Sequence, residues 1–365
     1  MAGNSWNGVF KYDCLKAAND VEYANTAIPK TPCFVAYTHD FQGLVGNDAK
    51  IELLKQQDEK FAHEAGIYIA KTKTNVFTSN YQSGKKVDIH EVDCSDSSGK
   101  VTIDSVRLAS FPQDEIIYAN GGCNYNGNLL FCAQGSFNHP SALTEIDPQT
   151  HKVRHLLTNY LGRPFNSVND VVIHHETGDI WFTDPTYGYE QAFRPSPRLP
   201  SQVYRFRPST GQVSCVADQF TQCNGLCFSP DYTKMYITDT GAIQAHATPG
   251  DGHNFSFNPR LPASIYEYDV VDEGTRLANR RTFAFCDVGV PDGIKCDTEG
   301  NVWSGTGSGV DCWNKRGELI GKIHVGGTVA NFNFSPVGIF MMAEERLMLA
   351  KVAAKGALGR AEGWA

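Results

Sequence analysis

The sequence lacks three features that would place it in a membrane, on nucleic acid or outside the cell. It contains no run of about 18 apolar residues, so no membrane-spanning helix is predicted. Its basic clusters are no longer than Lys85-Lys86 and Arg280-Arg281, and its formal net charge is −8. A nucleic-acid partner is therefore not expected, because phosphate binding needs clustered lysine and arginine. The opening MAGNSWNGVFKYD has no charged segment followed by an apolar one, so we recognise no signal peptide and expect a cytoplasmic protein.

Amphipathic helical segments are also scarce, whereas cysteine is abundant. Eleven cysteines are scattered along the chain, mostly inside apolar runs. Without a signal peptide, this pattern favours reduced, buried thiols, although it leaves one disulfide open. Cys223 and Cys227 are four residues apart, but zinc would need two further ligands nearby and the sequence offers none there.

A repeat of β-rich segments is the main organising feature of the sequence. The repeated strand is opened by turn residues and occurs as AGIYIAKTK, GNLLFCAQG, GDIWFTDPT, TKMYITDTG, GNVWSGTGS and, more weakly, VGIFMMAEE. A second strand follows most copies, as in SQVYRFRP and ASIYEYDV, with the period-two alternation of a strand that has two different faces. Six copies predict an all-β fold, a six-bladed β-propeller of four-stranded blades.

The repeat defines the expected domain limits. We predict a single propeller domain over residues 1–365, with repeat blades over 61–350 and an N-terminal extension over 1–60. The early strand PCFVAYTHDF is expected to share a blade with the late strand RLMLAKVAA and so close the ring. The segment AKIELLKQQDEKFAHEAG is expected to hold a short helix. A doubly wound α/β fold is disfavoured, because no amphipathic segment of about 10–15 residues separates the strands.

Two insertions interrupt the repeat, at 187–200 and 241–262, and both follow a strand ending in Thr-Asp. Long loops at corresponding strand ends should lie on one face of a propeller, where such loops are often functional. The aromatic residues expected on this face are Tyr125, Phe137, Phe165, Tyr187 and Tyr189. They are candidates to line an apolar substrate pocket, with ordinary loop packing as the alternative.

The recurring strands are expected to be the innermost strands of the blades, and four polar residues precede them at equivalent points of the repeat: Glu64, Asn169, Asn224 and Asp292. In a propeller, such positions point toward the central channel although they lie far apart in sequence. Asn-Gly and Asp-Gly are also strong hairpin-turn patterns, so each taken alone predicts a turn. Their repeated placement favours a common site. Two carboxylates and two amide carbonyls are hard oxygen ligands, which suit Ca²⁺, with Mg²⁺, Mn²⁺ or Zn²⁺ as alternatives.

Several of these segments together resemble one known family. They are HEAGIYI, NSVNDVVIH, GDIWFTDPTYGY, LPSQVYRFRPSTG, NGLCFSPD, YITDTG and PDGIKCDTEGNVWSG. They resemble the SMP-30/gluconolactonase/regucalcin family of six-bladed propellers, and most of all its fungal lactonohydrolases, over Phe61 to Asn333. The resemblance implies a divalent metal, usually calcium, with Glu64, Asn224 and Asp292 at the ligand positions. Asn169 matches a position that binds substrate or, in related propellers, the metal.

The resemblance also implies the chemistry. In that family the metal polarises a lactone carbonyl and activates water, and an aspartate at the position of Asp292 acts as the base. Asp170 and His63 are further candidates for proton transfer, and His63 is also a candidate to contact substrate. Because neighbouring residues on a strand face opposite ways, His63 is expected outside the ligand shell of Glu64. Ser167 stands where animal members carry arginine, so an acidic sugar lactone is not the expected substrate.

The leading hypothesis is a metal-dependent hydrolase that opens a lactone or related cyclic ester, with a small molecule as its partner. One alternative is a biosynthetic enzyme on the same scaffold that condenses or cyclises a secondary-metabolite intermediate, by a pericyclic step or otherwise. The other is a calcium-binding regulatory protein without catalysis, for which a small, closed channel is expected. The sequence leaves the oligomeric state open.

Overall fold

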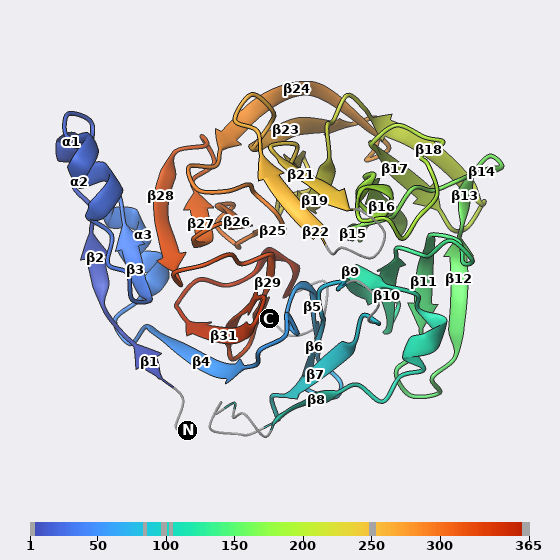
Figure 1. Ribbon diagram of the computed structural model, residues 1–365, viewed down its shortest axis with the longest axis horizontal. Helices are drawn as coiled ribbons and strands as arrows, with labels where there is room; N and C mark the ends of the chain where they lie inside the picture. The colour runs from blue at the N-terminus through green and yellow to red at the C-terminus, as the bar shows by residue number, and fades with distance from the viewer. Residues whose placement is uncertain (1–3, 83–85, 96–100, 102–104, 248–252, 360–365) are drawn as a thin grey trace.

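The chain forms a ring of six β-sheets around a central axis, as Figure 1 shows. This computed structural model describes residues 4–82, 86–95, 101, 105–247 and 253–359. The four strands that build each blade run antiparallel to their neighbours, and the six-bladed β-propeller predicted from the repeat is confirmed. None of the helices in the described part of the chain is long and apolar enough to cross a membrane.

The first four blades are built from consecutive segments of the chain. Blade 1 contains β5 (Glu64–Ile69), β6 (Thr74–Thr78), β7 (Ile89–Asp93) and β8 (Val106–Leu108). Blade 2 contains β9 (Ala119–Tyr125), β10 (Asn128–Ala133), β11 (Ala142–Ile146) and β12 (Val153–Leu157). Blade 3 contains β15 (Val171–His174), β16 (Asp179–Asp184), β17 (Gln202–Arg207) and β18 (Gln212–Ala217). Blade 4 contains β19 (Cys223–Phe228), β20 (Lys234–Asp239), β23 (Ser264–Val271) and β24 (Arg276–Phe285).

The last two blades combine strands from both ends of the chain. Blade 5 contains β25 (Ile294–Cys296), β26 (Val302–Thr306), β27 (Gly309–Trp313) and β28 (Leu319–His324), and β3 (Cys33–Ala36) and β2 (Val9–Lys11) extend its outer edge. Blade 6 contains β29 (Asn331–Ser335), β30 (Gly338–Ala343), β31 (Arg346–Lys351), β4 (Lys50–Gln56) and β1 (Ser5–Trp6). A short hairpin of β13 (Asn159–Tyr160) and β14 (Arg163–Pro164) lies between blades 2 and 3 in sequence.

The strand that closes the ring differs from the one expected. β31 pairs with β4, with Met348 opposite Leu53, whereas β3 pairs with β28, with Ile323 opposite Phe34. The segment expected to hold a helix over 49–66 therefore begins as the strand β4. The helices lie elsewhere: α1 (Cys14–Ala17), α2 (Val21–Thr26), α3 (His39–Val45) and α4 (Tyr187–Glu190), with the 3₁₀ turns η2 (Gln113–Glu115) and η3 (Ala357–Gly359).

The innermost strands are β5, β9, β15, β19, β25 and β29, which contact one another in sequence around the axis. The segments GDIWFTD, KMYITD and GNVWSG were expected to be innermost, but they form the second strands β16, β20 and β26. The short strands before them are innermost instead. As a result, the polar residues that precede or open these short strands lie nearer the axis than the recurring segments themselves.

The hydrophobic core is divided among the spaces between adjacent blades. One cluster between blades 3 and 4, for example, joins Trp181 to Leu226 and Met235, all of which are fully buried. All eleven cysteines are free thiols, and most are buried within these clusters, as the scattered pattern predicted. Cys223 contacts Ser201, whereas the Cys227 sulfur lies 3.8 Å from that of Cys296, so the two cysteines of the CNGLC segment face different neighbours.

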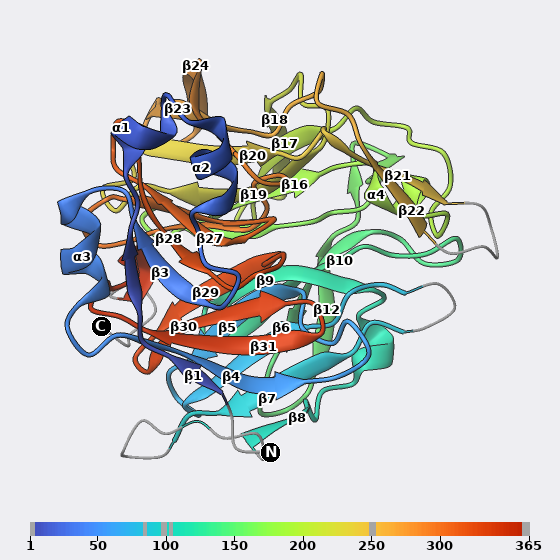
Figure 2. The same cartoon turned by 60° about the vertical axis from the view of Figure 1, so that its left-hand side comes forward.

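The two insertions lie together at one side of the ring, as Figure 2 shows. The first begins with α4, and the second forms a hairpin of β21 (Ile243–Ala247) and β22 (His253–Phe257). α4 and β21 are in contact.

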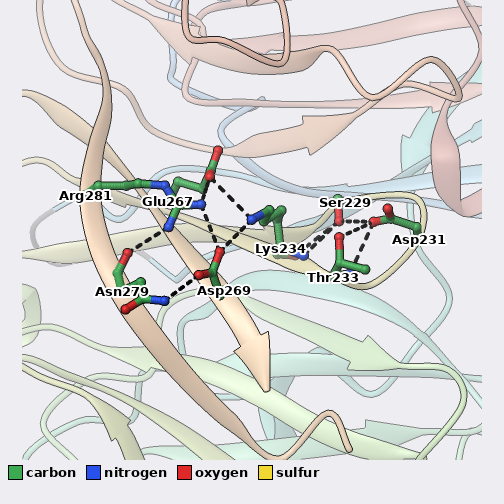
Figure 3. Close-up of polar contacts among 8 residues, drawn as sticks. All are labelled: Ser229, Asp231, Thr233, Lys234, Glu267, Asp269, Asn279 and Arg281. Atoms are coloured by element: carbon green, nitrogen blue, oxygen red, sulfur yellow. Dashed lines mark hydrogen bonds and ion pairs between the residues drawn. The ribbon is translucent and has the colours of Figure 1, made fainter. Parts of the chain in front are cut away.

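Charged side chains link the outer three strands of blade 4, which come before and after this hairpin in the sequence (Figure 3). Lys234 on β20 lies 2.5 Å from Asp269 on β23, and Arg281 on β24 pairs with both Asp269 and Glu267. These side chains are partly exposed, so each pair is expected to contribute no more than about 1 kcal/mol to stability.

Candidate active site

The four predicted oxygen donors line one cavity at an end of the central channel, with a volume of about 260 Å³. Glu64 opens β5, Asn169 comes two residues before β15, Asn224 lies in β19, and Asp292 comes two residues before β25. They therefore come from blades 1, 3, 4 and 5. Glu64, Asn169 and Asn224 are almost fully buried, whereas Asp292 is partly exposed to the cavity.

The glycines that follow Asn224 and Asp292 serve close approach of the strands and do not form hairpin turns. Neither Gly225 nor Gly293 has a positive φ, and Gly225 lies inside β19. A Cβ atom on Gly225 would lie 2.5 Å from the Asp292 backbone oxygen, and one on Gly293 would lie 2.2 Å from Asn331 Oδ1. Both distances are too short for a Cβ contact. Glycine thus allows the innermost strands to bring their polar residues together at the axis.

Two site residues each have their backbone carbonyl oxygen held by a threonine from the preceding blade. Thr183 Oγ1 donates a hydrogen bond to the Asn224 carbonyl oxygen at 2.7 Å, and Thr238 Oγ1 donates to that of Asp292 at 3.0 Å. These threonines come from the Thr-Asp strand ends that stood out in the repeat. Each therefore links the second strand of one blade to the innermost strand of the next, which positions the site around the ring.

The donor atoms fit a hard cation. Asn169 Oδ1, Asn224 Oδ1 and Asp292 Oδ1 are all buried without a hydrogen-bond partner. Buried polar atoms are almost always paired, and each unpaired one costs about 1–3 kcal/mol. Three such oxygens in one cavity beside Glu64 form the kind of oxygen cluster that Ca²⁺ binds. This supports the predicted ligand set through an observation independent of the resemblance.

The two carboxyl groups of the site resist ionisation in the absence of a cation. Burial, together with the nearby Asp292, raises the pKa of Glu64 to about 8. Burial and the charge of Glu344 likewise raise the pKa of Asp292 to about 8, with contacts from Asn224 and Glu64 opposing the shift. Two neighbouring acids with raised pKa values are typical of a functional site.

Sequence reasoning missed three residues of this site: Asn120, Asn331 and Glu344. Asn331 Nδ2 donates to Glu64 Oε2 at 2.6 Å, and Asn120 Nδ2 donates to the Asn169 backbone oxygen at 3.2 Å. Asn120 and Asn331 come from the innermost strands of blades 2 and 6. The segments ANGG and NFNF, which hold these asparagines just before the recurring strands, carried the same pattern as the four predicted donors.

His63 and Glu344 form a paired acid and base at the cavity wall. His63 Nδ1 lies 2.8 Å from Glu344 Oε1, and Asn80 Nδ2 donates to Glu344 Oε2 at 2.9 Å. Burial opposes the charge of both residues, but their pairing outweighs it, so the pKa of His63 is raised and that of Glu344 is lowered to about 2. His63 precedes β5, so strand alternation does not apply to it, and both His63 and Glu64 line the cavity.

Asp170 has a different environment from the other acids. It is buried, and its two oxygens accept hydrogen bonds from the backbone N–H groups of Val171 and Leu226, at 2.9 and 3.3 Å. It therefore links blade 3 to blade 4, and it is not among the residues that line the cavity.

The aromatic candidates divide into two groups. Tyr187 lines the cavity, and its hydroxyl contacts Thr240 and accepts a hydrogen bond from Asn224 Nδ2 at 3.1 Å. Tyr125 and Phe165 lie instead in the hydrophobic cluster between blades 2 and 3. Phe137 and Tyr189 are 65% and 50% exposed and do not line the cavity.

The fold and the site together define a class: a six-bladed propeller with a cluster of carboxylate and amide oxygens at one end of its channel. The family described as SMP-30/Gluconolactonase/LRE-like region matches residues 85–335, more than half of the chain. The chain belongs to this family.

Two curated relatives extend this result. The chain is 32% identical to the lactonohydrolase oryL of Aspergillus oryzae over 354 residues, which cover 91% of this chain and 79% of that protein. It is 28% identical to a gluconolactonase of Zymomonas mobilis over 191 residues, which cover 50% of this chain and 48% of that protein.

Solved structures with the same architecture include a gluconolactonase from Xanthomonas campestris. That structure has a TM-score of 0.68 and 25% identity, over 87% of this chain and 94% of that chain. The calcium-binding protein regucalcin from Agrobacterium tumefaciens has a TM-score of 0.58 and 17% identity, over 84% of this chain and 94% of that chain. The regucalcin comparison supports the fold alone.

Proposed function

We propose that this protein is a metal-dependent hydrolase that opens a lactone or related cyclic ester. The observation that carries the proposal is the set of three buried, unpartnered oxygens from Asn169, Asn224 and Asp292 beside Glu64. The relatives named lactonohydrolase and gluconolactonase support a lactonase-type enzyme acting on a small molecule.

The four residues Glu64, Asn169, Asn224 and Asp292 would hold the cation. Their mixture of carboxylate and amide oxygens favours Ca²⁺, which is also the ion named for the regucalcin neighbour. When bound, such a cation polarises an ester carbonyl and lowers the pKa of water.

The remaining chemistry belongs to the side chains around the cavity. Asp292 is the candidate base, because its carboxylate is partly open to the cavity and can accept the proton of an attacking water. His63, held by Glu344, is the candidate to protonate the departing oxygen, because its pairing with Glu344 raises its pKa and so favours the protonated ring. Tyr187 fixes the amide of Asn224 through their hydrogen bond. Asp170, whose two oxygens accept hydrogen bonds from the backbone of blades 3 and 4, is assigned a structural role in this scheme.

Lactone hydrolysis is favoured over the two alternatives that the sequence left open. The named relatives give no particular support to condensation or cyclisation. A regulatory protein without catalysis was expected to have a small, closed channel, whereas the cavity here holds about 260 Å³ and is lined by residues of both insertions.

A lactone hydrolysis assay with EDTA treatment and calcium add-back tests the proposal. Asp292→Asn and Glu64→Gln should each lower kcat/KM by at least about 100-fold, because each removes a charged ligand of the cation. Asp218→Asn, at an exposed position outside the cavity, is the matched control and should behave like the wild type. Full activity in EDTA, or in both site variants, would refute the proposal.

A further inference from the structure

The hairpin of β21 and β22 has one apolar face and one polar face where its side chains are described. Ile243 pairs with Phe257 and Ala245 with Phe255, so these four residues share a face. Gln244 pairs with Ser256 on the opposite face. This alternation is what a strand produces when one side meets an apolar partner.

The apolar face of the hairpin meets the cavity. Ile243, Ala245 and Phe255 line it, together with Val290 from the segment before β25. Phe255 is nevertheless 57% exposed, and Phe257, on the same face but outside the cavity lining, is 55% exposed. A large, solvent-exposed apolar side chain on a cavity wall indicates a surface for an apolar ligand.

The polar wall of the cavity comes from other blades. Lys60, His63 and Asn80 flank the start of blade 1, and Glu344 follows β30 in blade 6. In a ring of six blades, blade 4, which carries the hairpin, lies across the axis from blade 1. The cavity therefore has a charged side and an apolar side, with the oxygen cluster between them.

We propose that this hairpin binds an apolar substituent of the substrate, so that the substrate is a lactone carrying an alkyl or aryl group. The inference rests on the proposed function for the lactone ring itself. The ring carbonyl lies toward the oxygen cluster, and the substituent lies against Ile243, Phe255 and Val290. A polyhydroxylated sugar lactone would leave this wall without a partner and bring hydroxyl groups against apolar atoms, which is unfavourable.

A series of γ-lactones with increasing alkyl chains tests the inference. For the wild type, each added methylene should lower KM about fourfold until the wall is covered, with little change in kcat. Phe255→Ala should raise KM for a long-chain γ-lactone about tenfold and leave that for γ-butyrolactone unchanged. Ile243→Asn tests the same wall from the other strand. Phe285→Ala, at an exposed position outside the cavity, is the control.

Binding of the matching alkyl lactams, which resist hydrolysis, provides a measurement that does not depend on turnover. Calorimetry should show the same dependence on chain length and its loss in Phe255→Ala. If lactones are hydrolysed but neither KM nor lactam binding depends on chain length, the inference is wrong and the proposed function stands. If no lactone is hydrolysed but lactam binding depends on both chain length and Phe255, the proposed function is wrong and the apolar site stands.

Discussion

The raised pKa of Asp292 predicts how stability changes with pH. Without a cation, folded Asp292 keeps its proton up to a pH of about 8, whereas the unfolded chain releases it near 3.8. Between these values the folded state binds more protons, so this group lowers the free energy of unfolding as pH rises. Asp292→Asn cannot ionise and should remove this part of the pH dependence.

The difference between a pKa of 3.8 for Asp292 in the unfolded chain and about 8 in the folded protein corresponds to roughly 6 kcal/mol of stability if the whole shift applies. Asp292 is partly exposed to the cavity, and solvent there weakens the effect, so we expect about 2–3 kcal/mol. A cation should act in the opposite direction, because it binds the ionised form. Calcium at 100 times its dissociation constant should raise the stability of the wild type at pH 8 by about 2.7 kcal/mol.

Urea unfolding in EDTA at pH 5 and pH 8 measures the effect. The fall in stability between the two pH values should be smaller in Asp292→Asn than in the wild type by about 2–3 kcal/mol. Acids that do not interact with Asp292 contribute equally to both proteins. Glu64, whose pKa the charge of Asp292 raises, has a lower pKa in the variant, which changes the pH dependence in the same direction. Asp218→Asn should follow the wild type. Equal pH dependence in Asp292→Asn and the wild type, or no calcium effect on the wild type, would refute the reasoning.

Two further predictions concern packing and charge. Gly225→Ala should destabilise the protein by about 1–3 kcal/mol and weaken calcium binding, because its Cβ would lie 2.5 Å from the Asp292 backbone oxygen. Gly8→Ala is the control, because Gly8 also lacks a positive φ and has open space around its Cβ position, and equal effects of the two substitutions would contradict the packing argument. Lys322→Met should lower the free energy of unfolding in urea by about 3–5 kcal/mol, because the fully buried Asp311 loses the ammonium group 3.2 Å away. Lys234→Met, at a more exposed ion pair, should lower it by no more than about 1 kcal/mol. Similar losses of stability in the two variants would show that burial does not set the cost.

The repeat allowed the sequence to predict the blade count and to identify four polar residues that the structure brings together in one cavity. Both depend on local patterns that occur several times, so an error in one copy does not change the result. The same logic would have found Asn120 and Asn331, which hold the equivalent positions in the two blades left without a donor.

Long-range pairing explains the predictions that were wrong. The segment of β4 contains good helix formers such as Glu52, Leu53 and Lys55, and its pairing with β31 and β1 makes it a strand. Cys33–Ala36 and Lys50–Gln56 were both available to close the ring, and local sequence does not choose between them. Tyr125 illustrates a related limit, because alternation shows that β9 has two faces but not which one meets a neighbouring blade.

The completion of blade 6 by β4 has a consequence for how the protein is made. β4 leaves the ribosome on the order of half a minute before β31, its partner strand, at typical rates of synthesis. During that interval Ile51 and Leu54, which the finished ring buries, have no partner from β31. The nascent chain therefore carries a strand whose β31-facing edge is unpaired through nearly all of its synthesis, and chaperones are expected to bind it there.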